Sequence, residues 1–276
     1  MTAPMEPVAV RRAPALRTSV RNGLIGLLLV LAAISWWVTD DRMIGMDMGP
    51  ATEPGTLSFW IASWVVMMAA MMFPSIAPMV LMHRRIQLGK RDRGDVVQTG
   101  ATALFVTGYL LTWSAAGLVS YLALWAGHAW SPAFLAWDKA GPYVAGGAIV
   151  GAGLYQLTPF KDLCLTKCRS PFEFLLSAWR PGRIGALRMG MGHGAWCVGC
   201  CWALMLALIA LGVMSIGWMV FIAALIAFEK LLPWKKVANL SIAVLLVALG
   251  LGVAFAAENV PGLTVPSDVT GPTMNM

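Results

Sequence analysis

The sequence predicts an all-α integral membrane protein, a polytopic bundle of about seven transmembrane helices. Three observations predict this class: 59% of the 276 residues are hydrophobic, only 12% are charged, and the mean hydropathy is +0.73. So few charged residues cannot cover the surface of a soluble domain of this size. The apolar runs approach or exceed the ~20 residues with which a helix crosses a bilayer, which favours helices over the alternating strands of a barrel.

Seven apolar segments follow one another along the chain, separated by polar loops. The first resembles the apolar core of a signal peptide, but no small-residue cleavage site follows it, so we predict an uncleaved anchor. Pro74 and Pro78 interrupt the second segment and are expected to kink its helix. The predicted spans are residues 23–38, 57–82, 99–126, 141–159, 194–213, 216–232 and 236–257.

The fourth span and the connection after it differ in composition from the other segments. Four glycines between residues 146 and 153 give the fourth span a smooth face for close contact with another helix. Residues 160–192 form the longest predicted connection, and six basic residues lie there among apolar and aromatic ones. Within this connection, residues 171–179 are predicted to form an amphipathic helix on the membrane surface.

The positions of the basic residues predict the orientation of the chain. Short cytoplasmic loops collect lysine and arginine, and all 20 of these residues except Arg42 and Lys139 fall on one side of the seven-span topology. The amino terminus is therefore predicted to be cytoplasmic. Residues 1–22 are then a cytoplasmic lead, residues 23–257 one membrane domain whose connection 160–192 is cytoplasmic, and residues 258–276 an external tail.

The most specific feature of the sequence is a set of cysteines and one histidine on the predicted cytoplasmic side. The histidine and two of the cysteines recur every four residues, which places them on one face of a helix that is expected to begin at Gly194. Another pair of cysteines, again four residues apart, lies just upstream. The predicted metal ligands are Cys164, Cys168, His193, Cys197, Cys200 and Cys201.

The position and number of the cysteines favour metal binding over structural disulfides. A reducing cytosol keeps thiols reduced, and five is an odd number of cysteines. Thiolate sulfur is a soft ligand that suits Cu(I) first and zinc second. Two alternatives stay open. Cysteine can act as a small apolar residue in membrane helices, and Cys197 with Cys200 can form the Cys-x-x-Cys pair of a thiol oxidoreductase.

The methionines, of which the chain has 18, suggest a route for copper. Thioether sulfur binds Cu(I) but has little affinity for zinc or magnesium. Met43, Met46 and Met48 lie in the predicted external loop, and Met68 and Met72 lie one helical turn apart in the second span. These five residues are a predicted relay from the outside to the cytoplasmic thiols. The alternative is that the span methionines only fill gaps between apolar helices.

We expect structural and not functional roles for the few ionisable residues near the predicted spans. Glu229 is expected at the membrane interface, paired with a lysine, and Asp162 beside Lys161 is interpreted in the same way. His83 and His128 are expected to be solvated interface residues. No phosphate-binding loop, no supported Ser-His-Asp order and no dinucleotide fingerprint is present, so we predict no enzymatic activity.

The residues around the cysteines resemble a known family. The runs that carry the resemblance are YQLTPFK at 155–161, Cys164, CRSP at 168–171, GALRMG at 185–190, HGAWCVGCCW at 193–202, and residues 67–78 in the second span. Over residues 57–234 they are similar to the bacterial family of predicted metal-binding integral membrane proteins, domain of unknown function 2182. The resemblance implies metal binding in a bacterial inner (cytoplasmic) membrane, and it implies no particular reaction.

The predicted function is therefore the binding and transport or delivery of a soft transition metal at the cytoplasmic face. No ATP-binding motif is present, so transport would be passive or coupled to an ion gradient. The expected partners are the lipid bilayer, the metal ion and a metallochaperone or cuproenzyme. Nucleic acid is not expected, because the basic residues lie in short loops. The alternatives are a membrane thiol-disulfide oxidoreductase and a non-transporting assembly factor that supplies metal to an enzyme.

Overall fold

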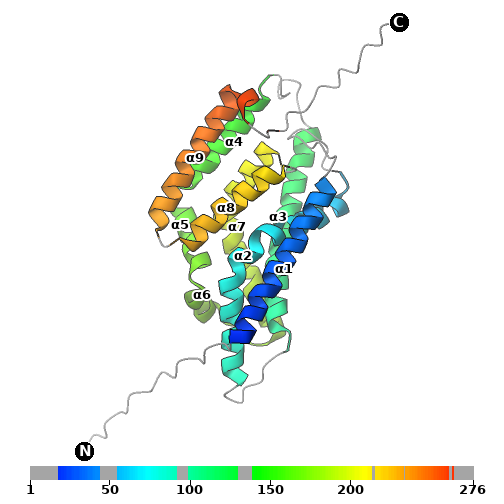
Figure 1. The fold of residues 1–276 in the computed structure, drawn as a ribbon, viewed down its shortest axis with the longest axis vertical. Helices are drawn as coiled ribbons and strands as arrows, with labels where there is room; N and C mark the ends of the chain where they lie inside the picture. The colour runs from blue at the N-terminus through cyan, green and yellow to red at the C-terminus, as the bar shows by residue number, and fades with distance from the viewer. Residues whose placement is uncertain are drawn as a thin grey trace, which may run out of the picture.

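The computed structural model describes residues 18–43, 55–91, 99–129, 139–212, 215–232, 234–260 and 263. Every regular element within these ranges is a helix (Figure 1), which confirms the predicted all-α class. The helices are α1 (Thr18–Met43), α2 (Leu57–Arg91), α3 (Ala101–Ala129), α4 (Gly141–Tyr155), α5 (Pro159–Arg169), α6 (Pro171–Ala178), α7 (Gly182–Leu211), α8 (Ile216–Leu231) and α9 (Lys235–Phe255), followed by a 3-10 turn, η2 (Ala257–Asn259).

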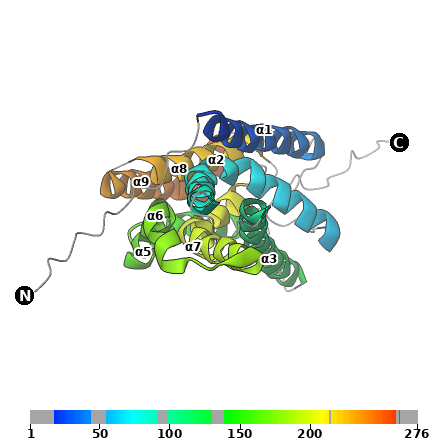
Figure 2. The same ribbon diagram turned by 90° about the horizontal axis from the view of Figure 1, so that it is seen from below.

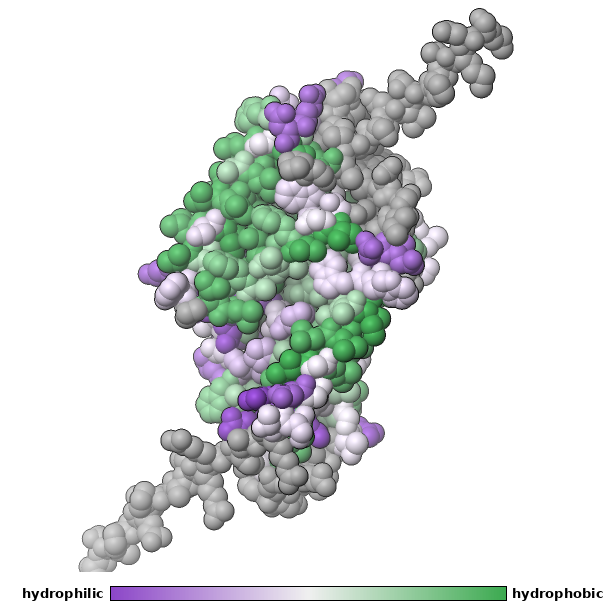
Figure 3. Space-filling view, in the orientation of Figure 1, coloured by the Kyte–Doolittle hydropathy of each residue, from purple (hydrophilic) through white to green (hydrophobic). Residues whose placement is uncertain are grey.

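Five helices in the described part of the chain are long and apolar enough to cross a membrane: α1, α2, α3, α7 and α9. Helices α4 and α8 contain 15 and 16 residues, which is fewer than the ~20 that span the hydrocarbon core. Apolar side chains cover much of the surface over α4, α8 and α9 and continue along α1 (Figure 3). The surface therefore fits a membrane protein, while the seven-span count and the cytoplasmic amino terminus stay predictions.

The region predicted as one long connection, residues 160–192, is mostly helical. It contains α5, α6 and the first turns of α7. A helix does occupy the predicted amphipathic stretch, and it buries Phe174 and Leu175 while Phe172 and Leu176 are exposed. Helix α7, however, begins at Gly182 and not at Gly194. That boundary was wrong because Arg183 and Arg188, which suggested a loop, lie in the first turns of α7, where Gly190 packs against α3.

Close contact between α3 and α7 explains why α7 extends so far toward its amino terminus. The two helices lie side by side in both views (Figures 1 and 2). A side chain added at Gly190 would collide with the backbone carbonyl of Phe105, and one added at Gly108 would collide with that of Leu187. Glycine at both positions lets the backbones approach, as is common between membrane helices. This contact fixes the register of α7, and with it the positions of the cysteines.

The predicted close helix contact of the fourth span is present between α4 and α9. Gly146 lies against the backbone of Gly250, and Gly153 lies against Val247 and Leu246. The other two glycines of the span face open space. Helix α2 continues as one helix through Pro74 and Pro78, and Figure 2 shows its two halves running in different directions, as expected of a proline kink.

Candidate metal centre

Two helices, α5 and α7, supply the cysteines of the candidate site. Helix α5 begins where the side chain of Thr158 accepts a hydrogen bond from the backbone N–H of Lys161, and Pro159 occupies its first turn. Its buried face packs against α7. The tight α3 contact holds α7 from the other side. Contacts of α5 with α7 and of α7 with α3 therefore position both cysteine-bearing helices.

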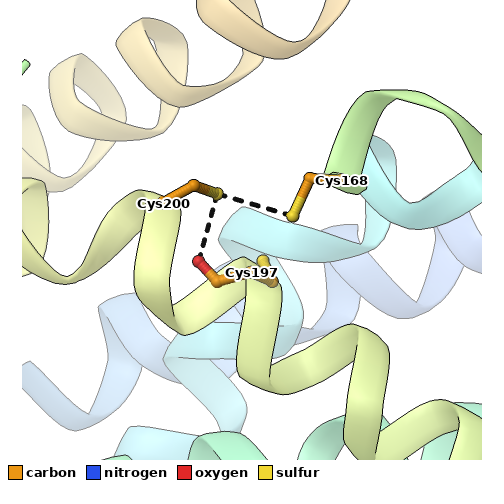
Figure 4. A group of neighbouring side chains, drawn as sticks. All are labelled: Cys168, Cys197 and Cys200. Atoms are coloured by element: carbon orange, nitrogen blue, oxygen red, sulfur yellow. Dashed lines mark hydrogen bonds between the residues drawn. The ribbon is translucent and has the colours of Figure 1, made fainter. Parts of the chain in front are cut away.

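Three sulfur atoms meet between these helices (Figure 4). The Sγ atoms of Cys168, Cys197 and Cys200 all lie within 4.8 Å of one another. Cys200 Sγ is 3.6 Å from Cys168 Sγ and 3.2 Å from the carbonyl oxygen of Cys197. Cys197 and Cys200 are buried, Cys168 is half-buried, and all five cysteines are free thiols. We call Cys168, Cys197 and Cys200 the thiol triad.

Cys200 also belongs to a second group of potential ligands. One ligand atom from each of Cys200, Cys201 and Glu229 lies within 4.8 Å of the other two. The Sγ atoms of Cys200 and Cys201 are 3.3 Å apart. All three residues are buried, so the second group extends the triad deeper between α7 and α8.

Polar groups from α3 and α8 surround Cys197. The Tyr109 hydroxyl and the Lys230 ammonium each lie 3.1 Å from Cys197 Sγ. Lys230 Nζ is also 4.0 Å from the thioether sulfur of Met72 in α2. An ammonium group at this position supplies the positive charge that buried thiolates need.

A fully buried ion pair lies behind the second group. Lys161 Nζ is 2.9 and 2.8 Å from the two carboxylate oxygens of Glu229, and neither side chain is exposed. Lys161 also donates a 2.7 Å hydrogen bond to the carbonyl oxygen of Cys200. Glu229 is paired with a lysine, as expected, but the partner is Lys161, 68 residues away, and α8 turns the carboxylate into the protein interior. Its position at the membrane interface stays a prediction.

The two cysteines of α5 have different surroundings. Cys164 is buried outside both ligand groups, and its sulfur fills the space beside Gly199, where a side chain would collide with it. Burial raises the pKa of the Cys164 thiol. The hydrogen bond with Cys197 raises the pKa of the Cys168 thiol. Because a thiol must lose its proton to become a ligand, loading the triad with metal would release protons.

His193 is buried in the middle of α7, one turn before Cys197, and belongs to neither ligand group. Its imidazole stacks against Phe105 and Tyr109, with ring centroids 6.1 and 5.8 Å away. Its Nδ1 atom has no hydrogen-bond partner in the described part of the chain. The role of His193 as a metal ligand stays a prediction.

Another histidine, His83, is fully buried rather than solvated at the interface. It stacks between Phe105 and Trp179, at centroid distances of 5.0 and 5.8 Å. Its Nδ1 atom is 3.1 Å from the hydroxyl of Thr102. The basic residues that follow His83 suggested a loop, but α2 continues to Arg91 and carries the imidazole against α3. The side chain of His128 lies outside the described residues.

The structure places part of the predicted methionine relay near the thiols. Met68 and Met72 are fully buried in α2, and Met72 approaches the triad through its contact with Lys230. Met46, Met48 and the side chain of Met43 lie outside the described residues. The relay therefore stays a prediction. Its innermost methionine, Met72, lies next to Lys230.

The donor atoms of the thiol triad fit a soft metal ion. Three thiolate sulfurs suit Cu(I), whereas structural zinc is almost always bound by four ligands in tetrahedral geometry. The donors of the triad therefore fit a soft transition-metal ion.

Sequence reasoning missed Tyr109, Lys230 and the Lys161–Glu229 pair as components of the site. Tyr109 carries no distinguishing sequence signal, because it lies within an ordinary apolar run. Glu229 and Lys230 did carry one: adjacent charged residues at the end of an apolar run are costly in a membrane and mark functional sites by default.

One comparison with known proteins identifies a family. A family model described as PpoB2, a copper chaperone, matches residues 61–253, a stretch that contains all five cysteines and most of the helices. No curated protein and no solved structure matches the chain. The family is a metal-binding one, as the sequence resemblance implied, although it carries the copper chaperone description and not the label domain of unknown function 2182.

Proposed function

We propose that this chain, which belongs to the PpoB2 family of copper chaperones, binds Cu(I) at the thiol triad and delivers it to an acceptor protein. The observation that carries the proposal is the meeting of three free thiol sulfurs within 4.8 Å of one another between α5 and α7. In this proposal copper is the cargo of the protein, held by Cys168, Cys197 and Cys200, with Lys230 supplying a compensating positive charge.

The unequal burial of the three cysteines supports delivery. The side chains of Cys197 and Cys200 on α7 are buried, whereas the side chain of Cys168 on the short helix α5 is half-buried. A sulfur ligand from an acceptor can therefore approach the metal most easily at Cys168. We propose that the acceptor sulfur replaces Cys168 first, so that copper passes by ligand exchange without being released as a free ion.

The orientation and the relay complete the proposal. The excess of basic residues in one set of loops supports a cytoplasmic position for the triad in a bacterial inner membrane. Met43, Met46, Met48, Met68 and Met72 would bring Cu(I) from the outer side, and Met72 would pass it beside Lys230 to Cys197. Met72 Sδ and Cys197 Sγ lie 4.0 and 3.1 Å from the same atom, Lys230 Nζ, and this proximity of the two sulfurs supports Met72 as the last step of the route.

Replacing Cys168 by serine tests binding and delivery together. We expect Cu(I) affinity to fall by more than about 100-fold, because even residues behind metal ligands contribute 10–100-fold. The purified chain in detergent would be loaded with Cu(I) without oxygen and analysed by inductively coupled plasma mass spectrometry. Transfer to a soluble acceptor with a Cys-x-x-Cys site would then be followed over time.

Cys164→Ser is the matched control for this experiment, since it removes a thiol from the same helix, one turn away, outside both ligand groups. It should leave binding and transfer unchanged. If the wild-type chain holds no copper, the proposal is wrong. If it instead forms a Cys197–Cys200 disulfide that cycles with thioredoxin, the thiol oxidoreductase is the better interpretation.

Leucine at all five relay methionines tests the route from outside. Leucine keeps size and apolarity, so each change should reduce stability by less than about 1.5 kcal/mol. The variant should insert normally and bind Cu(I) supplied to the purified protein. In cells, however, it should no longer support a copper-dependent enzyme at low external copper. Normal enzyme activity in a well-inserted variant would show that copper reaches the triad by another route.

A further inference from the structure

The two ligand groups share one sulfur atom, that of Cys200, and this arrangement points beyond a single copper site. We infer that the cluster holds two Cu(I) ions bridged by the Cys200 sulfur. One ion lies in the thiol triad, and the other is bound by the thiolates of Cys200 and Cys201, beside the carboxylate of Glu229. The inference rests on the proposed copper binding and adds the number of ions and the ligands of the second one.

The distances around Cys200 support a bridging role. Its sulfur has Cys168 Sγ at 3.6 Å and Cys201 Sγ at 3.3 Å, so it takes part in both groups without any movement of the helices. A thiolate sulfur has more than one lone pair and can bind two soft ions at once. Cys201 is buried and points into the cluster, where the single-site proposal gives it no role.

The carboxylate beside the second ion, that of Glu229, is already held in place. Lys161 contacts both of its carboxylate oxygens and also the carbonyl oxygen of Cys200. The lysine thereby fixes the carboxylate relative to the helix that bears the sulfurs. Each carboxylate oxygen accepts more than one interaction, so Glu229 can stay paired with Lys161 beside an ion that the two thiolates hold. As a hard oxygen donor it contributes little to the binding of Cu(I) itself.

The proton balance of the second site fits a monovalent ion. When Cu(I) replaces the proton of the Cys201 thiol, one positive charge replaces another and the net charge of the site is unchanged. Lys161 and Glu229 neutralise each other in both states.

The number of copper ions per chain tests the inference. The purified chain would be saturated with Cu(I) under anaerobic conditions, freed of excess metal, and analysed by inductively coupled plasma mass spectrometry and X-ray absorption. We expect two ions per chain and a copper–copper scattering signal. Cys201→Ser should hold one ion and lose that signal. Cys201→Ala, which adds no buried hydroxyl, should behave in the same way, and Cys164→Ser should retain both ions.

The outcomes separate the two proposals. One ion in both the wild type and the Cys201 variants would overturn the second site and leave the triad intact. Two ions in the Cys201 variants would overturn the assignment of the second ion to Cys201. A chain that binds no copper at all would overturn the proposed function itself. A thermal melt of each variant shows that it is folded when its metal is counted.

Discussion

Cys200→Ser is expected to remove nearly all copper from the protein, whereas Cys168→Ser takes a ligand from one group only. Its sulfur belongs to both ligand groups, so one change takes a ligand from each. A serine hydroxyl is a hard, neutral oxygen and does not replace a soft thiolate for Cu(I). Affinity should fall by more than about 100-fold, measured by competition with a colorimetric Cu(I) chelator.

Comparison with Cys201→Ser makes this prediction specific to the shared sulfur. Cys201 is the neighbouring residue, is equally buried and carries the same functional group, yet it belongs to one group only. Its replacement should leave the triad able to bind copper. If both variants lose copper to the same extent, the sulfurs act as one undivided site. If Cys200→Ser keeps its copper, the thiol triad is not the binding site.

Lys161→Met is expected to destabilise the fold by about 3–5 kcal/mol, because it leaves the carboxylate of Glu229 buried without its partner. The double variant Lys161→Met with Glu229→Met should recover most of this loss, since a buried ion pair and an apolar pair of similar volume are often equally stable. The measurement is the thermal unfolding of the metal-free protein in detergent, followed by circular dichroism.

A second lysine of the same helix provides the control. Lys167 pairs with Glu173 at 2.9 Å, but both side chains are partly exposed. Exposed pairs contribute about 0–1 kcal/mol, so Lys167→Met should change stability little. Equal losses for Lys161→Met and Lys167→Met would show that burial of the Lys161 pair is not what stabilises the fold. A double variant no more stable than the single one would show that the lysine acts through other contacts.

The fold class followed from composition, because apolar runs with few charges must be helices in a bilayer. The spacing of Cys197, Cys200 and Cys201 likewise predicted a common face, since α-helical geometry fixes neighbours three and four residues apart. The same rule could not predict which of Cys164 and Cys168 belongs to the thiol triad. Both lie on α5, but only one reaches the triad, and this depends on how α5 is set against Gly199 of α7.

Other features depend on contacts that no local pattern encodes. The Lys161–Glu229 pair joins residues 68 positions apart, so its existence depends on how α5 and α8 pack. The start of α7 depends on the fit of Gly190 against Phe105 of α3. Basic residues near that start predicted a loop, but tertiary packing extended the helix through them.

The ammonium of Lys230 lies between the sulfurs of Met72 and Cys197. In the proposed route it repels an arriving cation and, once copper is bound, offsets the charge of the thiolates. The repulsion by the ammonium and the attraction by the thiolates both grow with the charge of the ion. Lys230 therefore does not by itself select copper over other soft ions, and the choice of metal depends on the number and softness of the sulfur donors.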